Sequence, residues 1–269
     1  MDTLTLLRQM LRDDIGSGDI TSKAVVSPKT KARGFIIAKQ RGVLAGAKEA
    51  KLLFQTLGVR AKILKPEGEE ITPGTKILEV RGPARSILAA ERVALNLLMR
   101  MSGIATATRE LVRLAKAKNP KVVVAATRKT APLLARFDKR AVVVGGGSPH
   151  RRDLSEQILI KRNHLKIAGS IESALRLAKR AGRPPVEIEV SSAEEALRAA
   201  RAGADIIMLD NLTPAEIKRA VKLLERERLR EKVVLEASGG ITPANIQAYS
   251  ATGVDIISPE KAREMLFQK

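Results

Sequence analysis

The sequence predicts an α/β protein in which a small N-terminal sandwich of short strands and a helix precedes a parallel barrel or near-barrel. Three observations support this fold class. In the C-terminal half, short apolar runs alternate with amphipathic helices, the pattern of parallel strands covered on their outer side. Before residue 100, the apolar segments are short and separated by turn signals such as Pro73-Gly74. The G-x-G-x-x-G fingerprint of dinucleotide-binding open sheets is absent.

The N-terminal part combines short strands with helices. Its expected elements, in chain order, are an amphipathic helix at 1–16, a strand at 32–40, a helix at 48–58 and strands within 60–83. Residues 86–117 then predict one or two long helices, interrupted at Ser102-Gly103. We therefore expect an N-terminal α/β sandwich domain at 1–106, with its linking helices, and a barrel domain at 107–269.

The barrel domain contains a repeated strand–helix pattern. The expected strands are the apolar runs at 122–126, 141–145, 157–161, 186–190, 205–209, 233–237 and 254–258. The clearest helices lie at 170–182, 192–203 and 213–227, and glycine closes the first two. A further helix is expected after Thr242, with this residue as N-cap and Pro243 at the first position.

Composition excludes several kinds of protein. The chain has 269 residues, 44% of them hydrophobic, which is enough for a packed core. It has no Cys and only two His, so a cysteine nucleophile or a Cys-ligated zinc site is excluded and a histidine-rich metal site is not expected. No apolar run is long enough to span a membrane, and the start does not resemble a signal peptide. We expect a cytoplasmic protein.

The formal net charge of +20 has two interpretations. A basic surface can bind nucleic acid or another polyanion, or it can simply be a charge-rich solvated surface. The basic residues are spread over many helices and do not form one tract, which favours the second interpretation. A nucleic-acid partner is therefore not expected.

Charged and glycine-rich segments follow the predicted strands, where the carboxyl ends of barrel strands form an active site. Cations follow the first three strands, at Thr127-Arg128-Lys129, at His150-Arg151 after Gly145-Gly146-Gly147, and at Lys161. Carboxylates occupy the next three, at Glu187 and Glu189, at Asp210 and at Glu236. A purely structural barrel would not be expected to separate the two signs of charge in this way.

The carboxylates and glycines have specific expected positions. Glu187 and Glu189 are two residues apart on one strand and so point to the same face, toward the polar mouth of the barrel; alternatively, one lies at the strand edge in a salt bridge. Asp210 ends an apolar strand, where it either pairs with a lysine or serves function. Ser238-Gly239-Gly240 lets the backbone approach an anion closely, as a phosphate site requires.

Eight stretches in order resemble the quinolinate phosphoribosyltransferase family. They are GSGDITS, ERVALNLLMRMSGIATAT, ATRKT, VVGGGSPHR, ILIKRNH, VEIEV, ADIIMLDN and LEASGGIT, and they extend over nearly the whole chain. The resemblance implies an α/β sandwich with an incomplete barrel, acting as a homodimer or larger oligomer with shared sites. It implies phosphoribosyl transfer from phosphoribosyl pyrophosphate to quinolinate with decarboxylation, in NAD biosynthesis.

By the same resemblance, Arg92 reaches the neighbouring subunit's site and contacts quinolinate. A positive pocket for the carboxylates and phosphates is implied for Thr127, Arg128, Lys129, His150, Arg151 and Lys161. Glu189 and Asp210 would serve the ribose and, indirectly through substrate or water, Mg²⁺, and with Lys129 they are the expected catalytic residues. Ser238, Gly239 and Gly240 would hold the 5-phosphate. No organic cofactor is expected.

The chain departs from the family pattern at several positions. Arg162 stands where Asp is usual, Ala126 replaces a common Asp, and Pro132-Leu133-Leu134-Ala135 replaces Pro-Gly-Leu-Arg. Pro259-Glu260 follows the last strand where a glycine-containing phosphate loop is usual, and an acidic side chain there would repel phosphate. These departures leave two alternatives open: a paralogous barrel with another acceptor base, and a catalytically weakened polyanion-binding protein.

Overall fold

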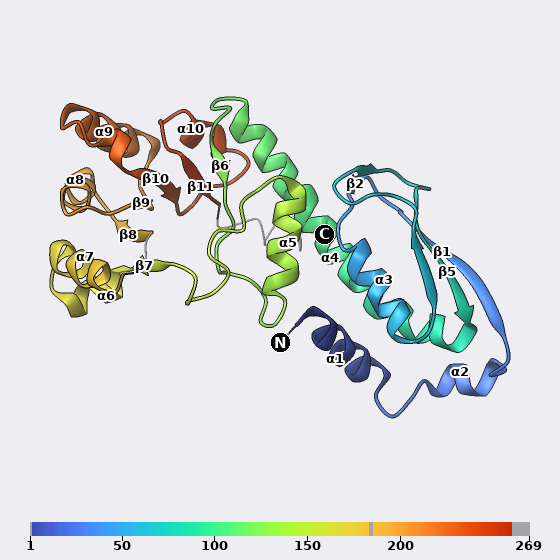
Figure 1. The fold of residues 1–269 in the computed structure, drawn as a ribbon. Helices are drawn as coiled ribbons and strands as arrows, with labels where there is room; N and C mark the ends of the chain where they lie inside the picture. Colours follow the sequence, from blue (N-terminus) through green and yellow to red (C-terminus); the bar gives the residue numbers. More distant parts are fainter. Residues whose placement is uncertain (1, 183–184, 260–269) are drawn as a thin grey trace. The chain divides into compact units, whose positions relative to one another are not determined.

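The structure is a computed structural model that describes residues 2–182 and 185–259. The chain forms two compact units, Met1–Thr106 and Ala107–Lys269. The helix α4 (Ala84–Lys116) supplies residues to both (Figure 1). No helix among the described residues is long and apolar enough to cross a membrane.

The first unit contains two small antiparallel sheets and helices. One sheet has the order β1 (Lys31–Ile37), β5 (Lys76–Pro83), β3 (Arg60–Ile63), and the other pairs β2 (Gly42–Val43) with β4 (Glu70–Ile71). The helices besides α4 are α1 (Thr3–Ile15), α2 (Ile20–Val25) and α3 (Ala47–Thr56). The sequence pattern predicted α1, α3 and the strand regions, but it did not predict the short helix α2.

The core of this unit is aliphatic, as the composition requires. Asp2 caps α1 by accepting from the Thr5 amide, and the helix buries Leu7 and Leu11 on one face. Leu53 and Phe54 of α3 are also fully buried.

The expected interruption at Ser102-Gly103 is wrong, because α4 runs through both residues. The Ser102 hydroxyl donates to the Ala45 carbonyl at 3.0 Å and lies 3.1 Å from the Ala45 amide. Tertiary contacts of this kind outweigh the weak local tendency of Ser-Gly to break a helix. Helix propensity alone could not reveal them.

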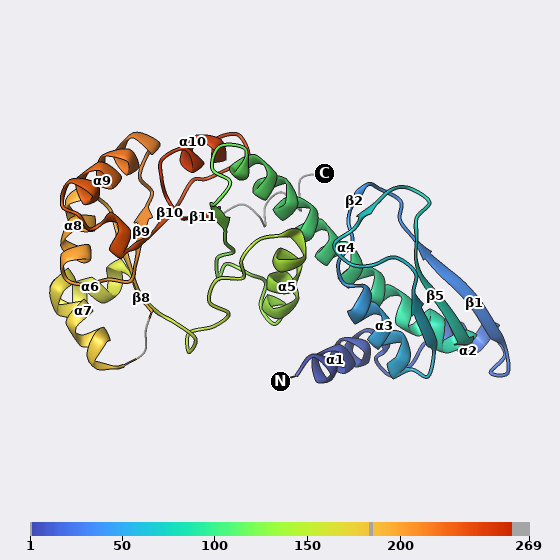
Figure 2. The ribbon, with the colours of Figure 1, turned by 45° about the horizontal axis from the view of Figure 1, so that its top comes forward.

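The second unit contains a six-stranded parallel sheet with helices along its outer side (Figure 2). The strand order is β6 (Val123–Val124), β11 (Ile256–Ser258), β10 (Val234–Ser238), β9 (Ile206–Asp210), β8 (Val186–Val190), β7 (Ile158–Ile160). The first and last strands of this unit, β6 and β11, are therefore neighbours, as in a barrel. β7 pairs only with β8 among the described residues, and the barrel is incomplete.

Helices follow the strands in the expected order. They are α5 (Ala135–Gly145), α6 (Arg162–Ala168), α7 (Ile171–Arg180), α8 (Ala193–Arg201), α9 (Pro214–Arg226) and α10 (Ile246–Ser250). The three helices predicted at 170–182, 192–203 and 213–227 are confirmed as α7, α8 and α9. Thr213 and Glu216 form a capping box at the start of α9.

The expected strand at 141–145 is wrong, because these residues are the end of helix α5. Phe137, Ala141 and Val142 are buried at helical spacing, whereas Val143 is half exposed. Packing of this apolar face overrides the strand preference of the valines. The glycines at 145–147 therefore end a helix, with Gly146 in the left-handed conformation at φ 96°.

The helix after β10 begins later than expected. α10 starts at Ile246 with Asn245 before it, so Thr242 is not its N-cap. The Asn245 side chain instead accepts from the Thr242 amide at 2.7 Å and donates to the Gly240 carbonyl at 3.0 Å. These contacts stabilise a turn over 242–245, where a helix was predicted.

Candidate active site

The carboxyl ends of the parallel strands bring most of the predicted residues to one edge of the sheet. Glu189 lies in β8, Asp210 ends β9 and Ser238 ends β10. Their neighbours in the sheet are aligned, with Ser238 paired to Asp210 and Glu189 to Met208. The cations lie in the loops that follow β6, α5 and β7, namely Thr127-Arg128-Lys129, His150-Arg151 and Lys161.

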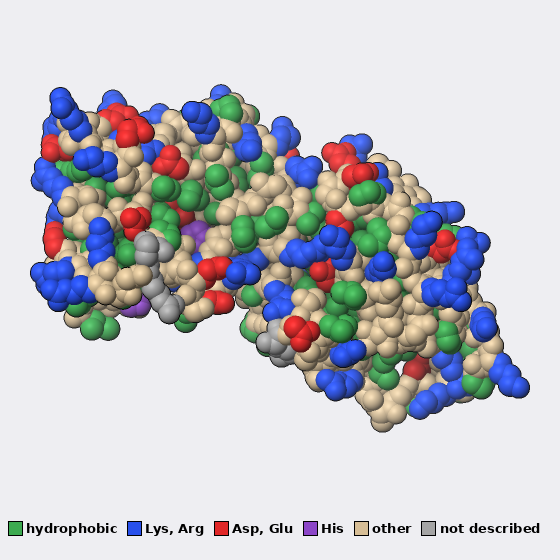
Figure 3. Space-filling view, in the orientation of Figure 1, with side chains coloured by type: hydrophobic (Ala, Val, Ile, Leu, Met, Phe, Trp, Pro, Cys, Tyr) green, Lys and Arg blue, Asp and Glu red, His purple; other side chains and the backbone are tan. Residues whose placement is uncertain are grey.

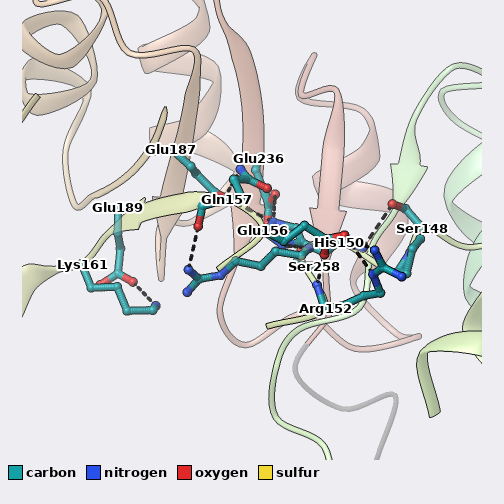
Figure 4. A network of polar contacts seen from close by, with 12 residues as sticks. Ser148, His150, Arg152, Glu156, Gln157, Lys161, Glu187, Glu189, Glu236 and Ser258 are labelled. Carbon is teal, nitrogen blue, oxygen red and sulfur yellow. Dashed lines mark hydrogen bonds and ion pairs between the residues drawn. The ribbon is translucent and has the colours of Figure 1, made fainter. Parts of the chain in front are cut away.

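A buried cluster forms around His150 (Figure 4). Its Nε2 lies 3.3 Å from a carboxylate oxygen of Glu187 and 3.3 Å from one of Glu236. Both glutamates are almost completely buried, and Ser258 donates a further hydrogen bond to Glu236. Among the described residues, Oε1 of Glu187 and Oε2 of Glu236 are buried without a hydrogen-bond partner. Such a pair of carboxylates is costly unless a proton or cation lies between them.

The ionisation of this cluster is shared among its members. Burial lowers the pKa of His150, but the contacts with Glu187 and Glu236 outweigh it and raise that pKa to about 9. Burial raises the pKa of Glu187. Nδ1 of His150 accepts from the Arg151 amide at 2.7 Å, a contact that favours the neutral ring with its proton on Nε2. The raised pKa values of His150 and Glu187 mean that the cluster retains an extra proton near neutral pH.

The same three residues could also bind a metal, since one donor atom from each lies within 4.8 Å of the others. The positive charge of Arg151, however, lowers the pKa of Glu187. A neighbouring cation opposes the binding of a second one. The shared proton therefore accounts for the arrangement better than a metal ion does.

Arg151 is buried beside the cluster, 6% exposed. Its Nη1 donates to the Gln157 carbonyl at 3.2 Å, but its Nε has no hydrogen-bond partner among the described residues. Burial lowers the pKa of Arg151, and Arg128 lowers it further. A buried guanidinium with a free donor is suited to an anionic ligand that completes its hydrogen bonds.

Lys139 is a buried cation that sequence analysis missed. It projects from α5, is 3% exposed, and donates to the Pro149 carbonyl. Burial lowers its pKa to about 8. The sequence prediction gave 141–145 as a strand and assigned no element to Lys139, whereas a helical interpretation of 135–145 would have placed it on the buried face.

A second cluster joins the ends of β7, β8 and β9. Nζ of Lys161 lies 2.6 Å from Glu189, and Asn211 donates to Asp210 at 2.8 Å. Burial raises the pKa of Asp210, and the nearby Glu189 raises it further, whereas Lys161 and Arg162 lower it. Lys161 therefore pairs with Glu189 and not with Asp210. Two neighbouring carboxylates supply the oxygen ligands that Mg²⁺ prefers.

The turn after β10 requires glycine. Gly239 has φ 91°, and a side chain there would lie 2.2 Å from Oδ1 of Asn211. Asn211 has φ 57°, and its amide donates to the Ser238 carbonyl at 2.8 Å. This hydrogen bond joins the ends of β9 and β10. Gly240, with φ 62°, is exposed beyond them.

Other residues singled out in the sequence lie on separate elements. Arg92 is exposed on α4 in the first unit, and Lys129 is exposed in the loop after β6, where its amide donates to Thr127 at 3.1 Å. Arg162 is exposed at the start of α6. Pro259 is buried, and Glu260 lies outside the described residues.

Fold and site define an α/β-barrel enzyme with cations for an anionic substrate on one side and paired carboxylates on the other. Comparison with known proteins specifies it further. Residues 19–102 match the family described as quinolinate phosphoribosyl transferase, N-terminal domain, and residues 104–264 match the corresponding C-terminal domain. The chain belongs to the quinolinate phosphoribosyl transferase family.

Individual relatives are similar to this chain over most of its length. A probable nicotinate-nucleotide pyrophosphorylase (carboxylating) of Archaeoglobus fulgidus is 48% identical over 90% of this chain and 92% of the relative. The rat enzyme, nicotinate-nucleotide pyrophosphorylase (carboxylating), is 41% identical over 87% of this chain and 79% of its own. The solved structure of the nicotinate-nucleotide pyrophosphorylase from Francisella tularensis is 36% identical, with a TM-score of 0.88 over 97% of this chain and 91% of that one.

Proposed function

We infer that the protein transfers a phosphoribosyl group from phosphoribosyl pyrophosphate to quinolinate and releases CO₂. The pyridine nitrogen would attack C1 of the ribose as pyrophosphate leaves. The 2-carboxylate then departs as CO₂ and a proton takes its place, which gives nicotinate mononucleotide. Family membership supports the reaction, and the observation in the site that carries it is the buried Arg151, whose Nε has no hydrogen-bond partner among the residues that the structure describes.

The acceptor would bind on the cationic side. Arg128 and Arg151 are close enough to lower the pKa of Arg151, so an arriving dianion relieves repulsion between them. Guanidinium groups bind carboxylates through two parallel hydrogen bonds. We propose that Lys129 and His150 complete this pocket, and that Arg92 enters it from a second subunit.

Ribosyl transfer would occur on the side of Glu189 and Asp210. Loss of pyrophosphate leaves a cationic, oxocarbenium-like ribose, which neighbouring carboxylates stabilise more than they stabilise the ground state. Lys161 holds Glu189 in place at 2.6 Å. We propose that Glu189 and Asp210 hold Mg²⁺ through water or the substrate. When bound, the ion neutralises the departing pyrophosphate.

The phosphate of the ribose would bind at Ser238, Gly239 and Gly240. Both glycines have positive φ, so their amides can face an anion without a side chain in between. Arg162, the departure from the usual Asp, lies near enough to Asp210 to lower its pKa and so adds positive charge on the pyrophosphate side.

We further propose that the protein acts as a cytoplasmic homodimer or larger oligomer with shared sites and without an organic cofactor. Arg92 and the other cations belong to different units of the chain, which supports sharing. Mixing inactive Arg92→Ala and Lys129→Ala proteins should restore part of the activity, because one hybrid site is intact. Absence of recovery, after labelled subunits are shown to exchange, would contradict a shared site.

The acceptor can be identified by calorimetry. We expect quinolinate to bind and nicotinate to bind at least tenfold more weakly, because each charge-assisted contact left unpaired costs about 1.5–3 kcal/mol. Equal affinities would favour another acceptor base. Formation of nicotinate mononucleotide, followed by chromatography, tests the reaction itself. No product with both substrates and Mg²⁺ present would instead favour a weakened, polyanion-binding protein.

A further inference from the structure

A closed circuit of contacts links Arg151 with His150, Glu187 and Gln157. Its amide donates to Nδ1 of His150 at 2.7 Å, and Nε2 of that ring lies 3.3 Å from Oε2 of Glu187. The same carboxylate oxygen accepts from the side-chain Nε2 of Gln157 at 3.0 Å. The backbone carbonyl of Gln157 in turn accepts from Nη1 of Arg151 at 3.2 Å. The loop between α5 and β7 is thereby tied to the strand β8 (Figure 4).

Glu236 holds the His150 ring from a second direction. It projects from β10, which is separated from β8 by β9, and its Oε2 lies 3.3 Å from Nε2 of the ring. Ser258 of β11 fixes the other carboxylate oxygen. Three strands thus set the position of one imidazole, and the carboxylates that do so are 0% and 1% exposed.

The backbone at His150 explains why so many contacts are needed. His150 has φ 50°, a left-handed conformation that a residue with a side chain adopts at a cost. Such a conformation persists only where the surroundings determine it. It also turns the chain so that both the amide and the side chain of Arg151 enter the circuit.

We propose that Glu187, Glu236 and Gln157 are positioning residues for Arg151: they hold the His150 ring and the loop before β7, and so aim the guanidinium at the acceptor carboxylate. The inference rests on the proposed function, since it takes Arg151 as a ligand of the acceptor. Neither glutamate needs to touch the substrate. Their effect should therefore fall on acceptor binding and not on the binding of phosphoribosyl pyrophosphate.

Steady-state kinetics of Glu187→Gln, Glu236→Gln and Gln157→Met test the inference. We expect the KM for quinolinate to rise about tenfold or more, the equivalent of one charge-assisted contact, with a KM for phosphoribosyl pyrophosphate within about twofold of wild type. Glu187→Ala should be worse than Glu187→Gln, because glutamine retains an oxygen that accepts from Gln157.

Asp205→Asn is the matched control. Asp205 accepts from the Val186 amide at 2.7 Å, at the opposite end of the same strands, so its loss should affect stability without changing either KM. If the folded Glu187→Gln and Gln157→Met proteins have a wild-type KM for quinolinate, or if both KM values rise equally, the positioning role is overturned.

Nitrogen NMR of the imidazoles separates this inference from the proposed function. The chain has only two histidines, and a His164→Gln variant assigns the signals. We expect His150 in the neutral form protonated at Nε2 or sharing that proton, and a shift of its nitrogen signals in Glu187→Gln and Glu236→Gln but not in Asp205→Asn. Wild-type protein without activity on quinolinate would refute the proposed function alone. Unchanged His150 signals in both glutamate variants would refute the circuit.

Discussion

Arginines and glutamates meet in two regions of this protein under opposite conditions. On the outer face of the β1–β5–β3 sheet, Arg33 and Arg81 both contact one oxygen of Glu79, and both arginine side chains are more than half exposed, 55% and 58%. At the carboxyl ends of the parallel strands, Arg151 and Glu187 are buried. The residue types are the same, but the exposure of the arginine side chains to solvent differs.

The exposed region shows that side chains of like charge can lie close together when water surrounds them. Arg33 stands directly opposite Arg81, which in turn stands opposite Arg60, so three arginines form a row across three strands. Like charges in this position repel, but water and salt screen exposed pairs. Lysines and arginines are likewise scattered over the visible surface (Figure 3). The net charge of +20 agrees with a solvated surface.

The buried region cannot rely on screening. A charge at the strand ends keeps its ionisation only through a partner, and where a partner is missing a ligand must supply one. The position of a charge, more than the number of charges, therefore indicates function here. Substitutions in the two regions should differ accordingly.

The largest effect is expected for Glu189→Gln and Asp210→Asn. Each keeps the shape of the side chain but removes a charge that matters most when the ribose becomes cationic. We expect a fall in kcat equivalent to about 2–4 kcal/mol, with little change in quinolinate affinity. Kinetics at saturating Mg²⁺ measure this. A kcat near that of wild type would leave Glu189 a structural partner of Lys161 and Asp210 a structural partner of Asn211.

The next largest effect is expected for Arg151→Lys. Lysine keeps the charge but lacks the planar fork, so quinolinate binding should weaken by about 1.5–3 kcal/mol, measured by calorimetry. The adjacent Arg152 is the matched control, because its side chain is 73% exposed and pairs with Glu156. Arg152→Lys should bind quinolinate like wild type. Equal losses in the two variants would remove the distinction between buried and exposed cations.

A smaller effect should appear in the pH dependence of stability. In the folded protein the buried cluster around His150 holds one extra proton up to about pH 9, whereas an unfolded histidine releases that proton near 6.5. The contribution is complete below pH 6.5 and is lost as the pH rises, so the free energy of unfolding should fall by roughly 1–2 kcal/mol between pH 6.5 and 8. Above pH 8 the lowered pKa of Lys139 acts in the opposite direction.

Urea titrations at several pH values measure this slope. Glu236→Gln should flatten it, because the ring then loses one of the carboxylates that raise its pKa. A slope that is the same in wild type and variant would mean that Glu236 does not raise the pKa of His150.

The smallest effect is expected for Glu79→Gln on the exposed sheet. Its partners remain solvated, so we expect activity equal to wild type and a change in urea midpoint close to experimental error. A large loss of either would show that the exposed arginine row carries more than surface charge.

The sequence predicted much of the fold and part of the site. Alternation of apolar runs with amphipathic helices predicted the parallel sheet, and the strand ends predicted Glu189, Asp210 and Ser238 at one edge. The valines at 142–144 misled the prediction of α5, because burial of one helical face outweighs their strand preference. The predicted helix break at Ser102-Gly103 is absent because Ser102 contacts Ala45, which is distant in the chain.

The circuit around Arg151 could not be predicted. Its members come from a loop and from β8, and it depends on a left-handed backbone at His150, which no local pattern in the sequence marks. Gln157 was missed for the same reason, because its role depends on contacts with neighbours distant in sequence. Lys139 was missed because 141–145 was predicted as a strand, whereas a helix there places Lys139 on the buried face.

The release of labelled CO₂ from quinolinate carrying the label in its 2-carboxylate is the most direct test. It should be measured for wild type, for an Arg33→Ala/Arg81→Ala double variant of the exposed sheet, and for Arg151→Lys at a quinolinate concentration below the wild-type KM. If buried charges at the strand ends perform the reaction, release requires phosphoribosyl pyrophosphate and Mg²⁺, is unchanged in the double variant, and falls at least tenfold in Arg151→Lys. Release that is independent of phosphoribosyl pyrophosphate, or equally reduced in the two variants, would contradict it.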